Sequence, residues 1–250
     1  MKKINLLMRD WRKGTVQLSS TLEKNGYKKD LVRKYVKSGW LESLGYGAFK
    51  LAGDEIDWYG AVAALQNQKA LAIRPGGKTA LELKGYAHYL IQTVAKVQLF
   101  GELGKILPKW FVNQEWYSMI SYTQTKLFGE DTQYYLSETK IENVTIKISS
   151  PEMAAMEMLH LVPIGQSFDE AAKIMEGLTT LRPKLVQELL EKCNSIKVKR
   201  LLLFMTEKND HPWMGELDLT KINLGAGKRV IVQNGFLDKK YQITVPREYA

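Results

Sequence analysis

Glycines divide the first fifty residues into short segments, and their spacing constrains the fold more than any other feature of the sequence. Apolar residues recur at helical spacing in three of the segments, which are 3–11, 19–24 and 28–38. Ser19 is expected at the N-cap of the second helix. Two segments suited to strands follow at 40–44 and 48–51, joined by a glycine-rich turn. Three helices and a hairpin are the order of a winged helix-turn-helix, which we predict for residues 1–53.

The third predicted helix has two faces of opposite character. Its apolar residues fall in one sector, whereas Arg33, Lys34 and Lys37 point away from it. Such a helix can pack its apolar side on its neighbours and lay its cationic side in the major groove of DNA. A surface helix whose lysines only keep it soluble is the alternative. The predicted DNA contacts, with the serines and the hairpin included, are Ser19, Ser20, Lys28, Lys29, Arg33, Lys34, Lys37, Tyr46 and Lys50.

The positive charge of the chain is concentrated at its beginning. Residues 1–53 hold 12 Lys/Arg and 4 Asp/Glu, whereas residues 54–250 hold 24 and 23. A short basic module on a nearly neutral body indicates that the front of the chain meets a polyanion, and duplex DNA is the partner that suits a winged helix.

Residues 54–250 predict a larger mixed α/β domain. Helical periodicity is clearest at 151–160, 168–178, 182–193 and 195–208, although residues 201–204 would also suit a buried strand. Strand-like stretches precede these helices, at 88–91, 97–100, 110–112, 119–122, 133–136 and 144–148. We therefore predict an α+β protein with two domains, residues 1–53 and 54–250.

Several classes of protein are disfavoured. The longest unbroken apolar runs have five residues, whereas a membrane span needs about twenty. Arg9 and Asp10 interrupt the first apolar stretch too soon for a secretory signal, and the lone Cys193 cannot form an internal disulfide. We expect a cytoplasmic protein that does not enter a membrane.

No motif indicates catalysis, a metal or a cofactor. The three histidines, His88, His160 and His211, lack metal-ligand spacing. Two glycine-lysine clusters at 76–79 and 225–229 lack the full phosphate-loop pattern, so turn chemistry explains both. We predict a protein that is not an enzyme and binds no cofactor.

Positive charge returns towards the end of the chain. Residues 181–250 carry 13 Lys/Arg against 8 Asp/Glu. Two interpretations stay open: a solvated face of mixed charge, or a second basic surface for nucleic acid or an acidic partner. The residues of this predicted second basic surface are Lys197, Lys199, Arg200, Lys228 and Arg229.

Several stretches, in their order along the chain, resemble the AbiEi antitoxins, the regulatory half of the bacterial abortive-infection AbiE type IV toxin–antitoxin systems. The stretches are KSGWL (37–41), GYGAF (45–49), YGAV (59–62), GGKTALELKG (76–85), LPKW (107–110), KVKRL (197–201), HPW (211–213), LGAGKR (224–229) and YQITVP (241–246). Each stretch alone is weak, and their common order across nearly the whole chain carries the resemblance.

The resemblance implies a winged helix-turn-helix that represses its own operon by binding repeated operator DNA. It also implies that residues 54–250 counter a nucleotidyltransferase-like toxin, without a stable complex being required. Two other functions stay open: a winged-helix transcription factor whose C-terminal domain senses a small ligand, and an enzyme that the winged helix delivers to nucleic acid.

Overall fold

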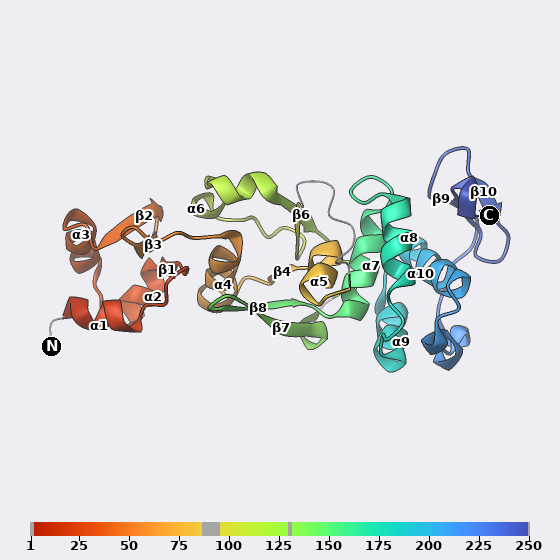
Figure 1. Ribbon diagram of the computed structural model, residues 1–250, viewed down its shortest axis with the longest axis horizontal. Helices are drawn as coiled ribbons and strands as arrows, with labels where there is room; N and C mark the ends of the chain where they lie inside the picture. The colour runs from red at the N-terminus through yellow and green to blue at the C-terminus, as the bar shows by residue number, and fades with distance from the viewer. Residues whose placement is uncertain (1–2, 87–95, 130–131, 250) are drawn as a thin grey trace. The chain divides into compact units, whose positions relative to one another are not determined.

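The computed structural model describes residues 3–86, 96–129 and 132–249 (Figure 1). Contacts divide the chain into two compact units. The first unit comprises Met1–Arg74, Leu99–Gln124 and Glu138–Lys147, and the second comprises Pro75–Gln98, Thr125–Ser137 and Ile148–Ala250. Helices and small sheets are mixed along the chain, so the predicted α+β class is confirmed.

The first unit begins with the predicted three helices and hairpin (Figure 1). The hairpin pairs antiparallel, and a short strand before the second helix joins its outer edge, giving the sheet order β1-β3-β2. One buried apolar cluster, which includes Leu7, Trp11, Leu22 and Val32, holds the three helices on the sheet. The elements are α1 (Lys3–Asp10), β1 (Gln17–Leu18), α2 (Ser19–Lys24), α3 (Lys29–Lys37), β2 (Leu41–Gly45) and β3 (Ala48–Leu51).

The prediction that Ser19 caps α2 is wrong. Leu18 occupies the N-cap, and no side chain bonds the open end of the helix there. The Ser19 N–H instead donates to the carbonyl of Gly47 in the hairpin turn, at 2.8 Å. Because β1 pairs with β3, the sheet rather than a capping side chain sets where α2 begins.

The next helix, α4 (Trp58–Gln68), is tied to the winged helix. The Gln68 side chain accepts the Leu18 N–H at 2.8 Å and donates to the carbonyl of Val16 at 2.7 Å. A Cβ on Gly60 would lie 1.9 Å from the carbonyl oxygen of Gly14, so only glycine permits this approach. Residue 53 is therefore not a boundary between compact units, and a functional division there remains a prediction.

The middle of the chain mixes short strands with short helical turns. The strands are β4 (Ile73–Pro75), β5 (Val97–Gly101), β6 (Ile120–Gln124), β7 (Leu136–Ile141) and β8 (Val144–Ser149), in sheets of order β4-β5-β6 and β7-β8. The helices are α5 (Gly77–Leu83), α6 (Lys109–Val112) and the 3₁₀ turns η1 (Glu115–Met119) and η2 (Thr132–Tyr135).

Two of the strand predictions in this region are wrong. Residues 110–112 lie in α6, a single helical turn that starts after Pro108, whose carbonyl accepts the N–H groups of Phe111 and Val112 at 2.9 and 3.2 Å. Residues 133–136 lie largely in η2, and the strand begins at Leu136. The prediction at 88–91 falls outside the described residues. Strands are confirmed at 97–100, 119–122 and 144–148, within a residue or two.

The second unit is a group of helices followed by a small sheet (Figure 1). Its main helices are α7 (Pro151–Leu161), α8 (Phe168–Glu176), α9 (Pro183–Lys192) and α10 (Ile196–Lys208). The helix is therefore confirmed over the alternative of a buried strand at 201–204. The chain ends with η3 (Pro212–Glu216), η4 (Leu219–Lys221), β9 (Arg229–Val230), β10 (Phe236–Asp238), β11 (Ile243–Val245) and η5 (Arg247–Tyr249). None of the helices described is long and apolar enough to cross a membrane.

Candidate nucleic-acid interface

The third helix carries a group of exposed cations on one side. Val32 is buried, and Tyr35 and Val36 pack against the same apolar cluster. The opposite side of α3 is exposed and holds Lys29, Asp30, Arg33, Lys34 and Lys37. Gly39, with a φ of 72°, ends the helix by adopting the left-handed conformation that glycine accepts readily. The two-faced geometry predicted for this helix is confirmed.

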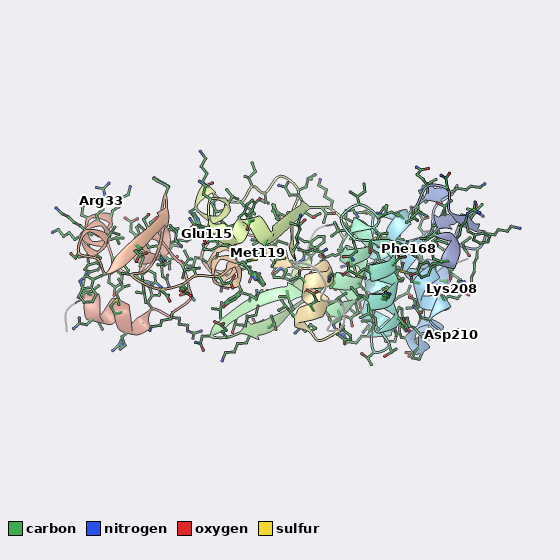
Figure 2. All side chains as sticks on the ribbon, turned by 45° about the horizontal axis from the view of Figure 1, so that its top comes forward. Arg33, Glu115, Met119, Phe168, Lys208 and Asp210 are labelled. Atoms are coloured by element: carbon green, nitrogen blue, oxygen red, sulfur yellow. The ribbon has the colours of Figure 1, made fainter. Side chains whose placement is uncertain are left out.

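The cations of α3 have few ion-pair partners within the described part of the protein. Arg33 lies on the outer side of α3 (Figure 2) and pairs with Asp30 at 3.6 Å, where both side chains are more than 70% exposed. Such a pair is screened by water and contributes little, so the guanidinium is open to exchange partners. Among the residues described, Lys29, Lys34 and Lys37 have no carboxylate partner. This side of α3 can therefore meet phosphates directly.

The other predicted contacts of the winged helix fall into two groups. Lys28 and Ser20 are exposed, Ser19 is half-buried, and the Tyr46 side chain is 93% exposed in the hairpin turn. Lys50, in contrast, is engaged within the protein. Its ammonium donates to the carbonyl of Asp54 at 2.7 Å and pairs with Glu42 at 3.1 Å.

Lys50 therefore supports the hairpin rather than extending from it, which corrects the expectation of a free contact. Glu42, its partner on the neighbouring strand, also accepts the Gly53 N–H. This backbone hydrogen bond and the Lys50 ammonium hold the pKa of the Glu42 carboxyl below its usual value. Two lysines that sequence reasoning missed, Lys69 and Lys109, line one groove together with Ser19, Ser20 and Tyr46.

The prediction of a second basic surface is wrong for most of its residues. Lys199 and Arg200 are 4% and 3% exposed. The Arg200 guanidinium donates to four backbone carbonyls, those of Leu224, Gly225, Gly227 and Gln242, at 2.6–3.2 Å. Lys199 donates to the carbonyl of Asn223 at 3.2 Å. These cations hold the loop before β9 by satisfying carbonyls that folding takes away from water.

The three remaining members of that predicted surface differ among themselves. Lys197 is half-buried and donates to the carbonyls of His160 and Val162 at 2.7 and 2.6 Å. Arg229 is half-buried and bonds the nearby carbonyls of Ala226 and Lys228. Lys228 alone of the five is exposed. No continuous basic surface forms from this set.

The glycine-lysine cluster that opens α5 is closed by the protein's own side chains. The Gly77 N–H donates to Glu157 at 3.1 Å, and the Lys78 N–H donates to the side-chain oxygen of Gln98 at 2.8 Å. The Lys78 ammonium is paired with Glu170 and Glu82. A phosphate would have to displace three carboxylates there, those of Glu157, Glu170 and Glu82, which favours the interpretation as turn chemistry for this cluster.

Metal ligands and the single cysteine are the remaining candidates for a chemical role. No group of three or more His, Cys, Asp and Glu residues described here could hold a metal ion. Burial raises the pKa of the Cys193 thiol to about 11, which keeps it protonated and unreactive at neutral pH.

Comparison with known proteins identifies the family over nearly the whole chain. Residues 1–92 match the family described as the AbiEi antitoxin N-terminal domain of transcriptional regulators. Residues 94–246 match the family described as the transcriptional regulator AbiEi antitoxin of type IV toxin–antitoxin systems. No curated protein sequence matches the chain.

A solved structure has a similar fold. The crystal structure of the RV2827C protein from Mycobacterium tuberculosis superposes with a TM-score of 0.65, covering 96% of this chain and 88% of that one. The sequence identity is 15%, so the likeness concerns the fold alone. On the two family matches, this chain belongs to the AbiEi antitoxins, transcriptional regulators of type IV toxin–antitoxin systems.

Proposed function

We propose that the protein represses its own operon by binding repeated operator sites through α3, and that it counters a nucleotidyltransferase-like toxin without acting as an enzyme. The observation that carries the DNA-binding half is the exposed cationic side of α3, opposite an apolar side that packs into the core. The toxin-directed half rests on the family alone. We assign that role to residues 54–250, and the proposal requires no stable complex with the toxin.

The residues of α3 divide by what their side chains can recognise. Arg33 has a planar guanidinium that can bond two acceptors of one guanine, so we assign it to base recognition. The ammonium groups of Lys29, Lys34 and Lys37 are point charges suited to phosphates. Lys28, Ser19, Ser20 and Tyr46 complete the proposed contact set from the flanking elements.

The test is the triple variant R33A/K34A/K37A. Each phosphate contact contributes a slope of about −0.9 to the dependence of log affinity on log salt, so we expect the slope to flatten by up to about 3. Affinity for the DNA upstream of the gene should fall at least 100-fold near 0.15 M salt, on the order expected for three charge contacts. Gel-shift titrations between 0.05 and about 0.3 M salt measure both quantities.

The matched control removes three exposed lysines of the second unit, as K184A/K228A/K239A. It changes the net charge by the same amount and should leave the slope nearly unchanged. In cells, the α3 variant should release a reporter under the upstream promoter while still protecting from the toxin. An unchanged salt slope, or repression that survives the triple change, contradicts the proposal.

A further inference from the structure

Two strands, β1 and β8, contribute to the lining of one groove in the first unit, and we call it the edge groove. It has a volume of about 380 Å³ and is lined by residues within the segments 10–17, 21–25, 63–68 and 143–145. The first two segments belong to the winged helix, and the other two belong to α4 and the start of β8. The edge groove therefore lies where the winged helix meets the chain that follows it.

Glutamines of α4 bond part of each strand edge. The Gln68 side chain accepts the Leu18 N–H at the edge of β1 and donates to the Val16 carbonyl. The Gln66 side chain makes the same pair of bonds on β8, where it accepts the Lys147 N–H at 2.9 Å and donates to the Lys147 carbonyl at 2.8 Å. Each side-chain amide thus bonds the donor and the acceptor that a neighbouring strand would bond.

The edge of β8 continues from Lys147 into the edge groove. Alternate residues of a strand direct their N–H and C=O groups to the same side, so Thr145 presents both groups on the side where Gln66 bonds Lys147. Thr145 is exposed and lines the edge groove. Because β8 pairs only with β7 among the strands described, no further strand covers this side. The main chain at Thr145 is therefore open to an added strand.

The chemistry of the lining suits a peptide rather than a polyanion. Asp10 and Arg12 are the only charged residues that line the edge groove, so the lining carries no net charge. Most of the other lining side chains are amides and hydroxyls, which supply the donors and acceptors that an extended main chain needs. Ala63 and Ala64 form part of the wall, and their short side chains leave space beside β8.

We propose that the edge groove binds a short extended segment of the toxin, which adds to β8 as a strand at Thr145. This inference rests on the proposed function and assigns its toxin-directed half to one surface. Strand addition to an open sheet edge is a general mode of peptide recognition, and the chain belongs to a family of antitoxins, so the toxin is the partner that suits it. A groove of this size buries far less area than a stable protein interface, so the contact is transient. A transient contact agrees with a toxin that is countered without a stable complex.

The experiment compares Thr145→Pro with Thr145→Val in the full chain. Proline removes the Thr145 N–H, and sheets tolerate it where that N–H faces outward from an edge strand. Valine keeps the N–H and the size of the side chain, so it is the matched control. The probes are fluorescently labelled, overlapping peptides that tile the toxin, together with the intact toxin. We expect at least one peptide to bind the wild type, Thr145→Pro to weaken it about 10-fold or more, and Thr145→Val to stay within about 2-fold, because only proline disrupts the main-chain hydrogen bonds.

Hydrogen exchange and a second pair of variants locate the contact. The Thr145 amide should exchange with deuterium rapidly in the free protein and at least about 10-fold more slowly with the peptide bound, since an added strand protects it. Asn67→Trp fills the edge groove from α4 and should also block the peptide, whereas Asn67→Ala leaves the groove open. Thermal melting shows that each variant is folded. In cells, Thr145→Pro and Asn67→Trp should lose protection from the toxin and keep repression, because α3 is unchanged.

The outcomes that overturn the inference are distinguishable from failure of the proposed function. If the wild type protects cells but Thr145→Pro and Asn67→Trp protect equally well, the proposed function stands and the edge groove is not the toxin's site. A wild type that protects yet binds neither the peptides nor the intact toxin counters the toxin without this contact. Self-association that Thr145→Pro abolishes, with toxin binding unchanged, would assign the edge groove to a second copy of the chain. If the wild type does not protect at all, the toxin-directed half of the proposed function fails and the inference fails with it.

Discussion

Two basic helices of this protein use the same kind of side chain in opposite ways. On α3 the cations stand in water and have few partners within the protein. On α10, Lys199 and Arg200 are buried and donate hydrogen bonds to backbone carbonyls. The exposed cations of α3 can bind a ligand, whereas the buried cations of α10 stabilise the fold.

The difference follows from the apolar residues around each set of charges. In α3 the apolar residues occupy one side, so the other side must face water. In α10 the run Leu201–Met205 is buried at every position, so the helix has no polar side along this stretch. A cation beside such a run is buried with it, so it needs hydrogen-bond acceptors from the protein in place of water. Charge density alone does not identify a binding surface.

The largest effect that this comparison predicts is on folding stability at Arg200. Arg200→Ala removes the guanidinium donor of the Leu224, Gly225 and Gly227 carbonyls, whereas the Gln242 carbonyl keeps the Arg229 N–H. We expect the free energy of unfolding to fall by about 3–5 kcal/mol. Urea denaturation measures this loss. Arg229→Ala is the matched control, because Arg229 bonds carbonyls only one to three residues away, and it should cost less than about 1 kcal/mol. A similar small loss at Arg200 would mean that water replaces the guanidinium.

A smaller, pH-dependent effect is expected where Lys197 meets α7. Burial and, after it, the Lys197 charge lower the pKa of His160 below its usual value. The unfolded chain therefore takes up a proton first, near pH 6.5, and stability is lost as the pH falls from about 6.5 towards the folded-state pKa. Lys197→Met removes the charge, so it should raise the His160 pKa and narrow that pH window.

The same substitution removes two hydrogen bonds to carbonyls and should cost about 1–2 kcal/mol at pH 7.5. An NMR titration of the imidazole and denaturation at several pH values measure the two effects. Lys184→Met, at an exposed position of α9, is the control. An unchanged His160 pKa would show that Lys197 does not act on the imidazole.

The smallest expected effect on stability is at α3. Replacing Arg33, Lys34 and Lys37 by alanine removes one exposed ion pair and no buried contact, so unfolding should change by less than about 0.5 kcal/mol. Differential scanning calorimetry on the variant used for DNA binding checks this. A loss above about 1 kcal/mol would place these side chains in the packing and remove the contrast with α10.

The winged helix was predictable because its signals are local. Gly26 and Gly39 follow the ends of α2 and α3, apolar spacing assigns α1 to α3, and the glycine-rich turn joins β2 to β3. The helices after residue 150 were predictable for the same reason. Residues 110–112 were not, because a short apolar run suits a buried strand or a turn of helix equally, and periodicity cannot separate the two over three residues.

The sequence by itself determined the order of elements at the front of the chain, the two-sided character of α3 and the concentration of positive charge there. Only the tertiary structure decided which cations remain available. The loop before β9 folds back onto α10 and supplies the carbonyls that bind Arg200. Segments around residues 18–20, 46–47, 69 and 108–110 meet to line one groove. Periodicity predicts which side of a helix or strand is apolar. The hydrogen-bond partner of a buried cation depends on which distant segment of the backbone packs beside it, and the sequence pattern does not contain that information.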